Sequence, residues 1–328
     1  MTEKLIADHE ARLSRIIRET VESYCNSNGL KTTMADDYRC PPLAIKKPFV
    51  TFRVGQCRDL IDALEATRVA ASQEPTRYYL NGVYLDGNGS GEGLTLVATD
   101  GHRVVAAENV ARQYSSGSNS TGALLINKVG HAHCWPGKEP VDYVKTALAF
   151  LRKLRKTESV LVTIGDDFIE FSNDVLVPLR IPHPQVTYPD WRRVLPRLDG
   201  PTVVRTFDAG STRSWLKETV ATARENRADH VLMRLSDTAE RTVAFYTSHG
   251  SDGAKSNSSP VPEAVCYTAS LTGAAGRFPD VGFNARYILD MLPKSGTVKI
   301  VTLAEYCDGP SSIVCQDGYV RAIMPIRL

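Results

Sequence analysis

The chain has 328 residues, a formal net charge of +2 and 7 cysteines. This length is enough for roughly two or three domains with sizeable hydrophobic cores. The nearly balanced charge excludes a globally basic nucleic-acid binder, so any DNA contact must come from local patches. The irregular cysteine spacing favours reduced thiols. Because no apolar run approaches the roughly 20 residues of a membrane span, we expect a cytoplasmic protein with no membrane partner.

The first 47 residues are predicted to form an amphipathic helix and a linker. Ile6, Leu13 and Ile16 fall on one side of a helix over residues 2–28, which Gly29 can end. Residues 31–47 are polar and contain proline, which is typical of a linker. The helix either packs on the rest of the chain or docks a partner, and the sequence leaves both interpretations open.

A repeating order of elements begins at residue 49. Each repeat has a strand, a helix and further strands, and one helix can bury its apolar face only against such a sheet. The predicted strands are 49–54, 78–85, 94–98, 123–127, 160–164, 168–172, 175–181, 203–207, 231–235, 242–248, 265–270, 298–303, 313–316 and 319–326. The predicted helices are 56–72, 141–157, 210–226 and 284–292. The fold class is therefore α+β, with two helix-plus-antiparallel-sheet units in each of two tandem domains.

The repeat is also visible in the residues of two predicted helices. Leu60–Arg68 aligns with Leu216–Arg224, and apolar, acidic and arginine positions stay in phase. This internal similarity supports four related units.

The stretch 77–105 is predicted to be a meander of strands. A glycine-rich loop over residues 86–93 joins two of them, and it lacks the Lys-Ser/Thr of a phosphate-binding loop. Asp100-Gly101 then separates two apolar runs, a pattern typical of a tight hairpin whose central residues need positive φ.

Five motifs resemble the bacterial replicative sliding clamp, the beta subunit of DNA polymerase III. They are Tyr78-Tyr79-Leu80-Asn81-Gly82, the run 97–103 (VATDGHR), the run 188–196 (YPDWRRVLP), the run 283–290 (FNARYILD) and the run 323–328 (IMPIRL). The resemblance covers the chain from about residue 48 and matches the second and third domains of that family. It implies tandem DNA-clamp domains at 48–198 and 199–328, with helices that line a ring.

The resemblance also implies a function without catalysis. A sliding clamp encircles double-stranded DNA non-specifically and tethers DNA polymerase and the clamp loader, which insert short linear motifs into a pocket. Carried over by position, this peptide-binding pocket comprises Leu80, Thr99, Gly101, His102, Arg103, Val104, Pro189, Arg193, Val194, Met324, Pro325, Ile326, Arg327 and Leu328. Apolar walls would take Leu or Phe anchors, and Arg103 and Arg193 would orient the peptide. Val104 replaces the usual leucine, and Arg321 and Ala322 precede the final motif.

A ring also needs cations that face phosphates without reading bases. On a helical wheel Lys145, Arg152 and Lys156 lie within roughly 20° of one line, and Arg213, Lys217 and Arg224 lie within about 40°. The resemblance adds Tyr78 and Tyr79, although core packing of one of them is an equal alternative. Either stripe can instead be an ordinary solvated helix face. Arg58, Arg68 and Arg286 are lesser candidates.

Other chemistry has little support in the sequence. The His131-Ala132-His133-Cys134 run admits a metal, but no second pair follows at ligand spacing, which favours a polar loop. Cys57 or Cys134 with a distant histidine could make a nucleophile and base, yet no flanking pattern supports activation. We therefore expect no enzyme, no cofactor and no metal.

The oligomeric state separates two functional hypotheses. Clamps of the bacterial family close a ring of six domains from two subunits, whereas two domains per subunit would require three subunits joined head to tail. The alternative is a non-ring adaptor or competitor that keeps only the peptide pocket. In either case the expected location is the bacterial cytoplasm, at the nucleoid.

The solution mass tests the ring hypothesis. Three chains of 36.0 kDa make a homotrimer of about 108 kDa. Sedimentation across a concentration series should show this species, whereas a monomer or dimer at every concentration, with and without DNA, would favour the adaptor.

Overall fold

The computed structural model describes residues 50–87, 93–115, 122–128, 130, 134–225, 232–237, 242–246, 267–268, 281–303 and 309–326. The contacts of the chain divide it into Met1–Pro48 and Phe49–Leu328. The first unit, with the predicted amphipathic helix, lies outside the described residues. The second unit contains all the described residues. None of its described helices is long and apolar enough to cross a membrane.

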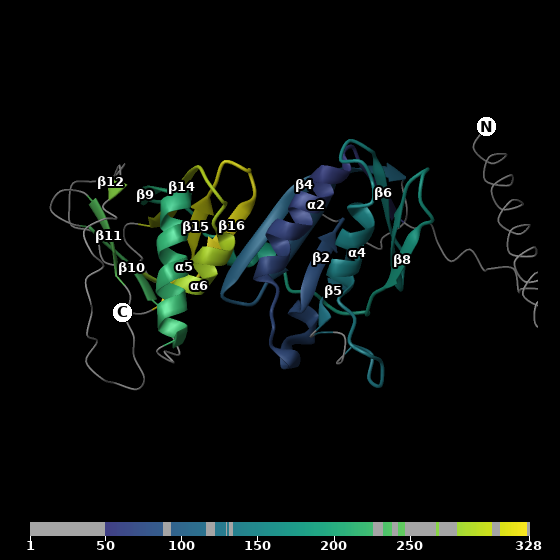
Figure 1. Cartoon of the computed structure of the whole chain (residues 1–328), viewed down its shortest axis with the longest axis horizontal. Helices are drawn as coiled ribbons and strands as arrows, with labels where there is room; N and C mark the ends of the chain where they lie inside the picture. Colours follow the sequence, from purple (N-terminus) through teal and green to yellow (C-terminus); the bar gives the residue numbers. More distant parts are fainter. Residues whose placement is uncertain are drawn as a thin grey trace, which may run out of the picture. The chain divides into compact units, whose positions relative to one another are not determined.

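The first two repeats each contain a strand, a helix and three strands (Figure 1). They consist of β1 (Val50–Val54), α2 (Cys57–Thr67), β2 (Gly82–Asp86), β3 (Gly93–Thr99) and β4 (Arg103–Ser115), then β5 (Gly122–Ile126), α4 (Tyr143–Leu151), β6 (Val160–Ile164), β7 (Phe168–Ser172) and β8 (Leu179–Pro182). Three short 3₁₀ helices, η2 (Arg68–Ala70), η3 (Pro75–Leu80) and η4 (Trp191–Val194), lie between or after these elements. The carboxylate of Asp142 caps α4 by accepting from the Lys145 amide at 2.9 Å.

The last two repeats follow the same order. They consist of β9 (Thr202–Asp208), α5 (Ala209–Glu225), β10 (Leu232–Asp237), β11 (Thr242–Tyr246) and β12 (Tyr267–Thr268), then β13 (Val281–Asn284), α6 (Ala285–Met291), β14 (Thr297–Leu303), β15 (Ser311–Val314) and β16 (Val320–Ile323). Asn284 caps α6 by accepting from the Arg286 amide at 3.0 Å. The predicted α+β repeat is confirmed, although β13 was not predicted.

Strand β4 joins the two halves of this unit. Its C-terminal part pairs antiparallel with β1, and its first four residues pair antiparallel with β16, with Ala106 opposite Val320 and Val104 opposite Ala322. The resulting sheet runs in the order β8-β7-β6-β1-β4-β16-β15-β14-β9, with β3, β2 and β5 attached through β4. Strands β12, β11, β10 and β13 form a second sheet.

Two large hydrophobic cores lie on either side of the β4–β16 junction. The first contains Phe52, Leu60 and Leu148, so that α2 and α4 cover the strands of the first half together. The second contains Phe283 and Ile288 and is covered by α5 and α6. Figure 1 shows each helix pair side by side. The division into domains at 198/199 stays a prediction, and the second core also contains Ala70, Ala98 and Val105 from before that boundary.

Three predicted elements differ from the structure. Tyr78 and Tyr79 lie in η3 rather than in a strand, because Pro75 fixes the first turn of this 3₁₀ helix. Helix α4 ends at Leu151, so Lys156 lies in a turn outside the helix. The predicted strand 175–181 begins only at Leu179, because Asn173 accepts hydrogen bonds from the two amides that follow Asp174 and holds them in a turn.

Candidate functional site

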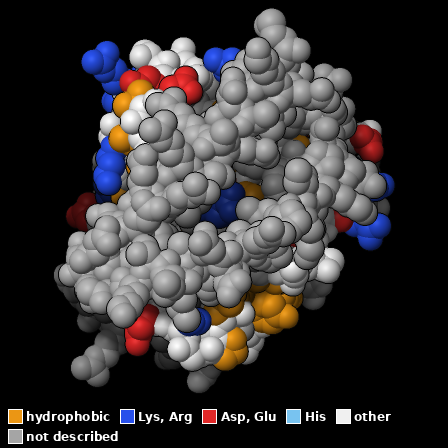
Figure 2. Space-filling model, turned by 90° about the vertical axis from the view of Figure 1, so that its right-hand side faces the viewer, with side chains coloured by type: hydrophobic (Ala, Val, Ile, Leu, Met, Phe, Trp, Pro, Cys, Tyr) orange, Lys and Arg blue, Asp and Glu red, His pale blue; other side chains and the backbone are white. Residues whose placement is uncertain are grey.

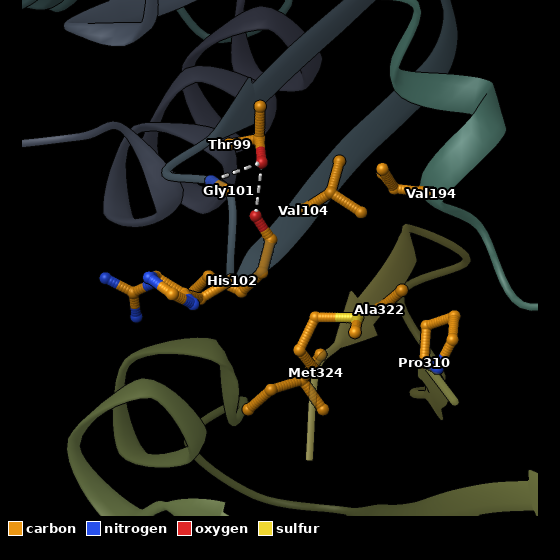
Figure 3. A pocket seen from close by; sticks show the side chains of 10 residues that line it. Thr99, Gly101, His102, Val104, Val194, Pro310, Ala322 and Met324 are labelled. Carbon is orange, nitrogen blue, oxygen red and sulfur yellow. Dashed lines mark hydrogen bonds between the residues drawn. The ribbon is translucent and has the colours of Figure 1, made fainter. Parts of the chain in front are cut away.

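A hollow lies where the β3–β4 hairpin meets η4 and the end of β16 (Figure 3). It has about 280 Å³ of empty space, part of which is open to solvent. Its lining residues are Thr99, Gly101, His102, Arg103, Val104, Val194, Pro310, Ala322, Ile323 and Met324. Figure 3 shows Val104 and Val194 on one side and Ala322, Met324 and Pro310 on the other. Segments from both halves of the sequence therefore make one concave, largely apolar surface.

The hairpin at the base of the hollow is held by its own polar groups. The Asp100 carboxylate accepts from the amides of His102 and Arg103 at 2.9 and 3.0 Å. The Thr99 hydroxyl donates to the Arg103 carbonyl at 2.6 Å and accepts from the Gly101 amide at 3.1 Å. Gly101 has φ +89°, as the hairpin prediction requires, whereas Asp100 keeps a negative φ. These bonds fix the turn from which the pocket residues project.

Arg103 connects this hairpin to α6. Its guanidinium bonds to Asp100 at 3.0 Å and to Asp290 at 2.9 Å, and it stacks over the Tyr287 ring at 4.3 Å. Its side chain is only 7% exposed. An arginine with two carboxylates and an aromatic ring is held in one orientation. Arg103 lines the hollow, as predicted. Its positive charge is already paired with Asp100 in the first half of the sequence and with Asp290 in the second.

The chain after β16 forms a second wall. The Met324 amide donates to the His102 carbonyl at 2.7 Å, and the Ile326 amide donates to the Gly282 carbonyl at 2.8 Å. These bonds hold the backbone while the side chains of Met324 and Ile326 stay 39% and 43% exposed. Of these two accessible apolar side chains, Met324 lines the hollow and Ile326 lies outside its lining.

The third wall is η4, which presents Val194 with 47% of its surface exposed. The Trp191 ring of η4 is buried in one hydrophobic cluster with Val104 and Ala322. The ring of Tyr188 stacks on Tyr84, with centroids 4.4 Å apart. Burial raises the pKa of Tyr188 and of Tyr84, so both phenols stay neutral and pack as uncharged rings.

The remaining predicted pocket residues are spread around this hollow. Leu80 is buried, whereas Pro189, Arg193 and Ile326 are exposed and do not line the cavity. Arg193 pairs with Asp190 at 3.2 Å. Pro325 is half-buried beside Met324, and Arg327 and Leu328 lie outside the described residues. Pro310 was missed, because it comes from a loop with no pattern that links it to the hairpin. Ile323 was predicted only as part of the final motif, and Ala322 was named only as a departure from the family pattern.

The predicted DNA-facing residues fall into separate groups. Lys145 and Lys217 are exposed on α4 and α5. Lys145 pairs with Asp142, and Arg152 pairs with Glu65 of α2.

Arg213 is partly buried and donates to the carbonyls of Leu289 and Leu292 at the end of α6, at 2.7 and 2.8 Å, which is a structural contact. Lys156 is exposed in its turn, Tyr78 and Tyr79 are exposed on η3, and the side chain of Arg224 lies outside the described ones.

Several of the exposed cations on α2 and α4 have acidic neighbours. Arg58 pairs with Asp62 on α2 at 3.3 Å, which adds to the pairs made by Lys145 and Arg152. Figure 2 shows acidic and basic side chains interspersed on the described part of one face. Such solvated pairs contribute little to stability and leave a weak, easily screened potential.

The cysteine and metal alternatives gain no support from the described residues. The Cys57 thiol is fully buried and donates to the Leu151 carbonyl at 3.3 Å. Burial raises its pKa to about 11, so the thiolate needed of a nucleophile is scarce near neutral pH. No group of three or more metal-ligating side chains is present in the described part of the chain. His131 and His133 lie outside it.

Comparisons with known proteins identify relatives of this chain. A family model for the central domain of the DNA polymerase III beta subunit matches residues 56–124. The Beta sliding clamp of Salmonella typhimurium is 27% identical over 274 residues, which cover 81% of this chain and 62% of that protein. The Beta sliding clamp of Caulobacter vibrioides is 46% identical over 141 residues, which cover 42% and 33%. The chain thus spans about 62% of the length of the first of these relatives.

Solved structures show the same fold. The beta subunit of DNA polymerase III from Thermotoga maritima has a TM-score of 0.64 at 19% identity, covering 89% of this chain and 69% of that chain. The sliding clamp from Bartonella birtlesii, crystallised with griselimycin, has a TM-score of 0.61 at 22% identity, covering 88% and 68%. The resemblance to the sliding clamp, inferred from the motifs, and the clamp fold are both confirmed.

The hairpin network gives a stability test. Replacing Asp100 with alanine removes the acceptor for two backbone amides and one partner of the buried Arg103 guanidinium. We expect the free energy of unfolding in urea to fall by about 2–4 kcal/mol. Asp166→Ala, in an exposed turn, serves as the matched control and should leave the unfolding midpoint nearly unchanged. Equal midpoints for the two variants would contradict the role given to Asp100.

Proposed function

We propose that this chain is a DNA sliding clamp, a non-catalytic processivity factor that encircles duplex DNA and tethers partner proteins through the hollow described above. The observation that carries the proposal is the position of this hollow. It forms where the hairpin of one half meets the last strand of the other, and its rim displays Val194 and Met324. Its partners would be a DNA polymerase and a clamp loader in the bacterial cytoplasm, at the nucleoid.

The chemistry of the hollow favours an extended peptide with apolar anchors. The lining hydroxyl of Thr99 and the guanidinium of Arg103 already have hydrogen-bond partners, so they do not demand polar groups from a ligand. Burying a Leu or Phe side chain against Val104, Val194 and Met324 would contribute about 1.5–3 kcal/mol per anchor. This supports recognition of short linear motifs, as the motif resemblance implies.

The compensated charges suit a protein that moves along DNA. A clamp must not hold one position, so its phosphate contacts have to be few and screened by salt. Lys145 and Lys217 project from helices into solvent, where they could approach phosphates without reading bases. Because Lys145, Arg152 and Arg58 have acidic neighbours, we expect weak retention on DNA unless a closed ring holds the chain topologically.

Retention on circular DNA tests the ring. Loaded onto a nicked circular plasmid, the protein should co-elute with the DNA in gel filtration and should leave when the plasmid is cut once. Loading requires either a clamp loader or spontaneous opening of the ring, so the experiment is run once with a clamp loader and once without it. An adaptor would never co-elute with the circle while still binding clamp-motif peptides.

Met324→Ala tests the pocket independently of the ring. A short fluorescent peptide with neighbouring Leu and Phe side chains serves as the probe. Loss of the Met324 side chain should weaken its binding roughly tenfold, because one apolar wall is removed. Val177→Ala, which truncates an exposed side chain that does not line the pocket, is the control. Equal affinity in both variants, measured by fluorescence anisotropy, would overturn the pocket assignment.

A further inference from the structure

Asp86 is a buried carboxylate outside the five clamp-like motifs, at the start of the stretch predicted as a glycine-rich loop. It ends β2 and is 5% exposed. We propose that Asp86 is a positioning residue for the peptide pocket, acting through Trp191 and Arg192 to hold η4 and its pocket side chain Val194. The inference rests on the proposed peptide-binding function and adds to it a residue that does not touch the peptide.

The contacts of Asp86 converge on η4 from the neighbouring sheet. Its Oδ2 atom accepts from the Trp191 Nε1 atom at 3.2 Å and from the Arg192 Nη1 atom at 2.9 Å. The Arg192 guanidinium also lies over the Trp191 ring, 4.3 Å from its centroid. One carboxylate therefore orients two consecutive side chains of a four-residue helix that could not hold its own conformation.

The same short helix reaches the pocket at its other end. Trp191 packs in a buried cluster with Val104 and Ala322, both of which line the hollow. Val194, the last residue of η4, lies on the same side of the hollow as Val104, across from Met324 (Figure 3). Fixing Trp191 thus fixes the distance between Val194 and the β4–β16 junction, which sets the width of the pocket.

A carboxylate suits this position better than an amide. The Trp191 indole and the Arg192 guanidinium both donate to the Asp86 Oδ2 atom. The negative charge of a carboxylate also offsets the positive charge of the guanidinium, which a neutral amide cannot do. Without the Asp86 side chain, the indole N–H would be buried without this acceptor, and η4 would have to be ordered when the peptide binds. Ordering on binding lowers affinity even where every contact to the ligand is kept.

The test compares Asp86→Ala and Asp86→Asn with the control Asp166→Asn, an exposed carboxylate in the β6–β7 turn. Affinity for the fluorescent Leu-Phe peptide should fall roughly tenfold in Asp86→Ala. It should recover in part in Asp86→Asn, whose amide oxygen can still accept from the indole. Arg192→Ala removes the more exposed of the two partners and should lower affinity less than Asp86→Ala does, because the bond from the Trp191 indole remains.

A second readout follows the indole directly. The Trp191 N–H resonance, assigned by its absence in Trp191→Phe, should exchange with solvent faster in Asp86→Ala than in wild type. A general loss of stability would instead speed exchange at the other two tryptophans, Trp135 and Trp215, as well. Faster exchange at Trp191 alone, together with weaker peptide binding, supports the proposal.

The contrary outcomes are distinct. Wild-type affinity in Asp86→Ala overturns this inference and leaves the pocket assignment intact, whereas a wild-type chain that does not bind the peptide overturns both. If Asp86→Ala does not fold, Asp86→Asn, Trp191→Phe and their double variant replace it. If the double variant loses less affinity than the two single variants lose together, Asp86 acts through Trp191. If the two losses of affinity are additive, the inference is overturned.

Discussion

The antiparallel pairing of β4 with β16 is the constraint on which the rest of this structure depends. One 13-residue strand pairs with three others: β3 along much of its length, β16 along its first four residues and β1 near its end. The register places Val104 opposite Ala322 and Arg103 opposite Ile323, so the chain after β16 must leave the sheet beside the β3–β4 hairpin. A register change of one residue would turn these side chains to the other face and remove the hollow.

The polar groups around the hollow are used to hold its walls in place. Asp100, Thr99 and Arg103 are bonded within the hairpin or to α6, and Asp86 is bonded to η4. The apolar residues Val194 and Met324 are the ones left accessible. If a peptide binds there as proposed, walls already held by these bonds would need little ordering, and the peptide would gain mainly from burying apolar surface.

The sequence predicted the repeat, the hairpin and most of the residues that line the hollow, because each depends on a local pattern or on a contiguous motif. It failed where the end or type of a short element had to be placed, and where a partner distant in the sequence decides the contact. Tyr78 and Tyr79 have strand propensity, but Pro75 starts a 3₁₀ helix. The helical wheel that grouped Lys156 with Lys145 assumed that the helix continues to residue 157, but α4 ends at Leu151. Arg213 resembled a free cation until the end of α6 supplied its acceptors, and Pro310 entered the pocket from a loop.

A photo-crosslinking map of the bound peptide tests the central claim most directly. A photo-reactive leucine would replace the apolar anchor of the Leu-Phe peptide, and mass spectrometry would locate the attached residues on the full chain. The account predicts attachment at Val194, Met324 and Pro310, which border the hollow. Attachment at sites remote from the β3–β4 hairpin, with none at these residues, would contradict it.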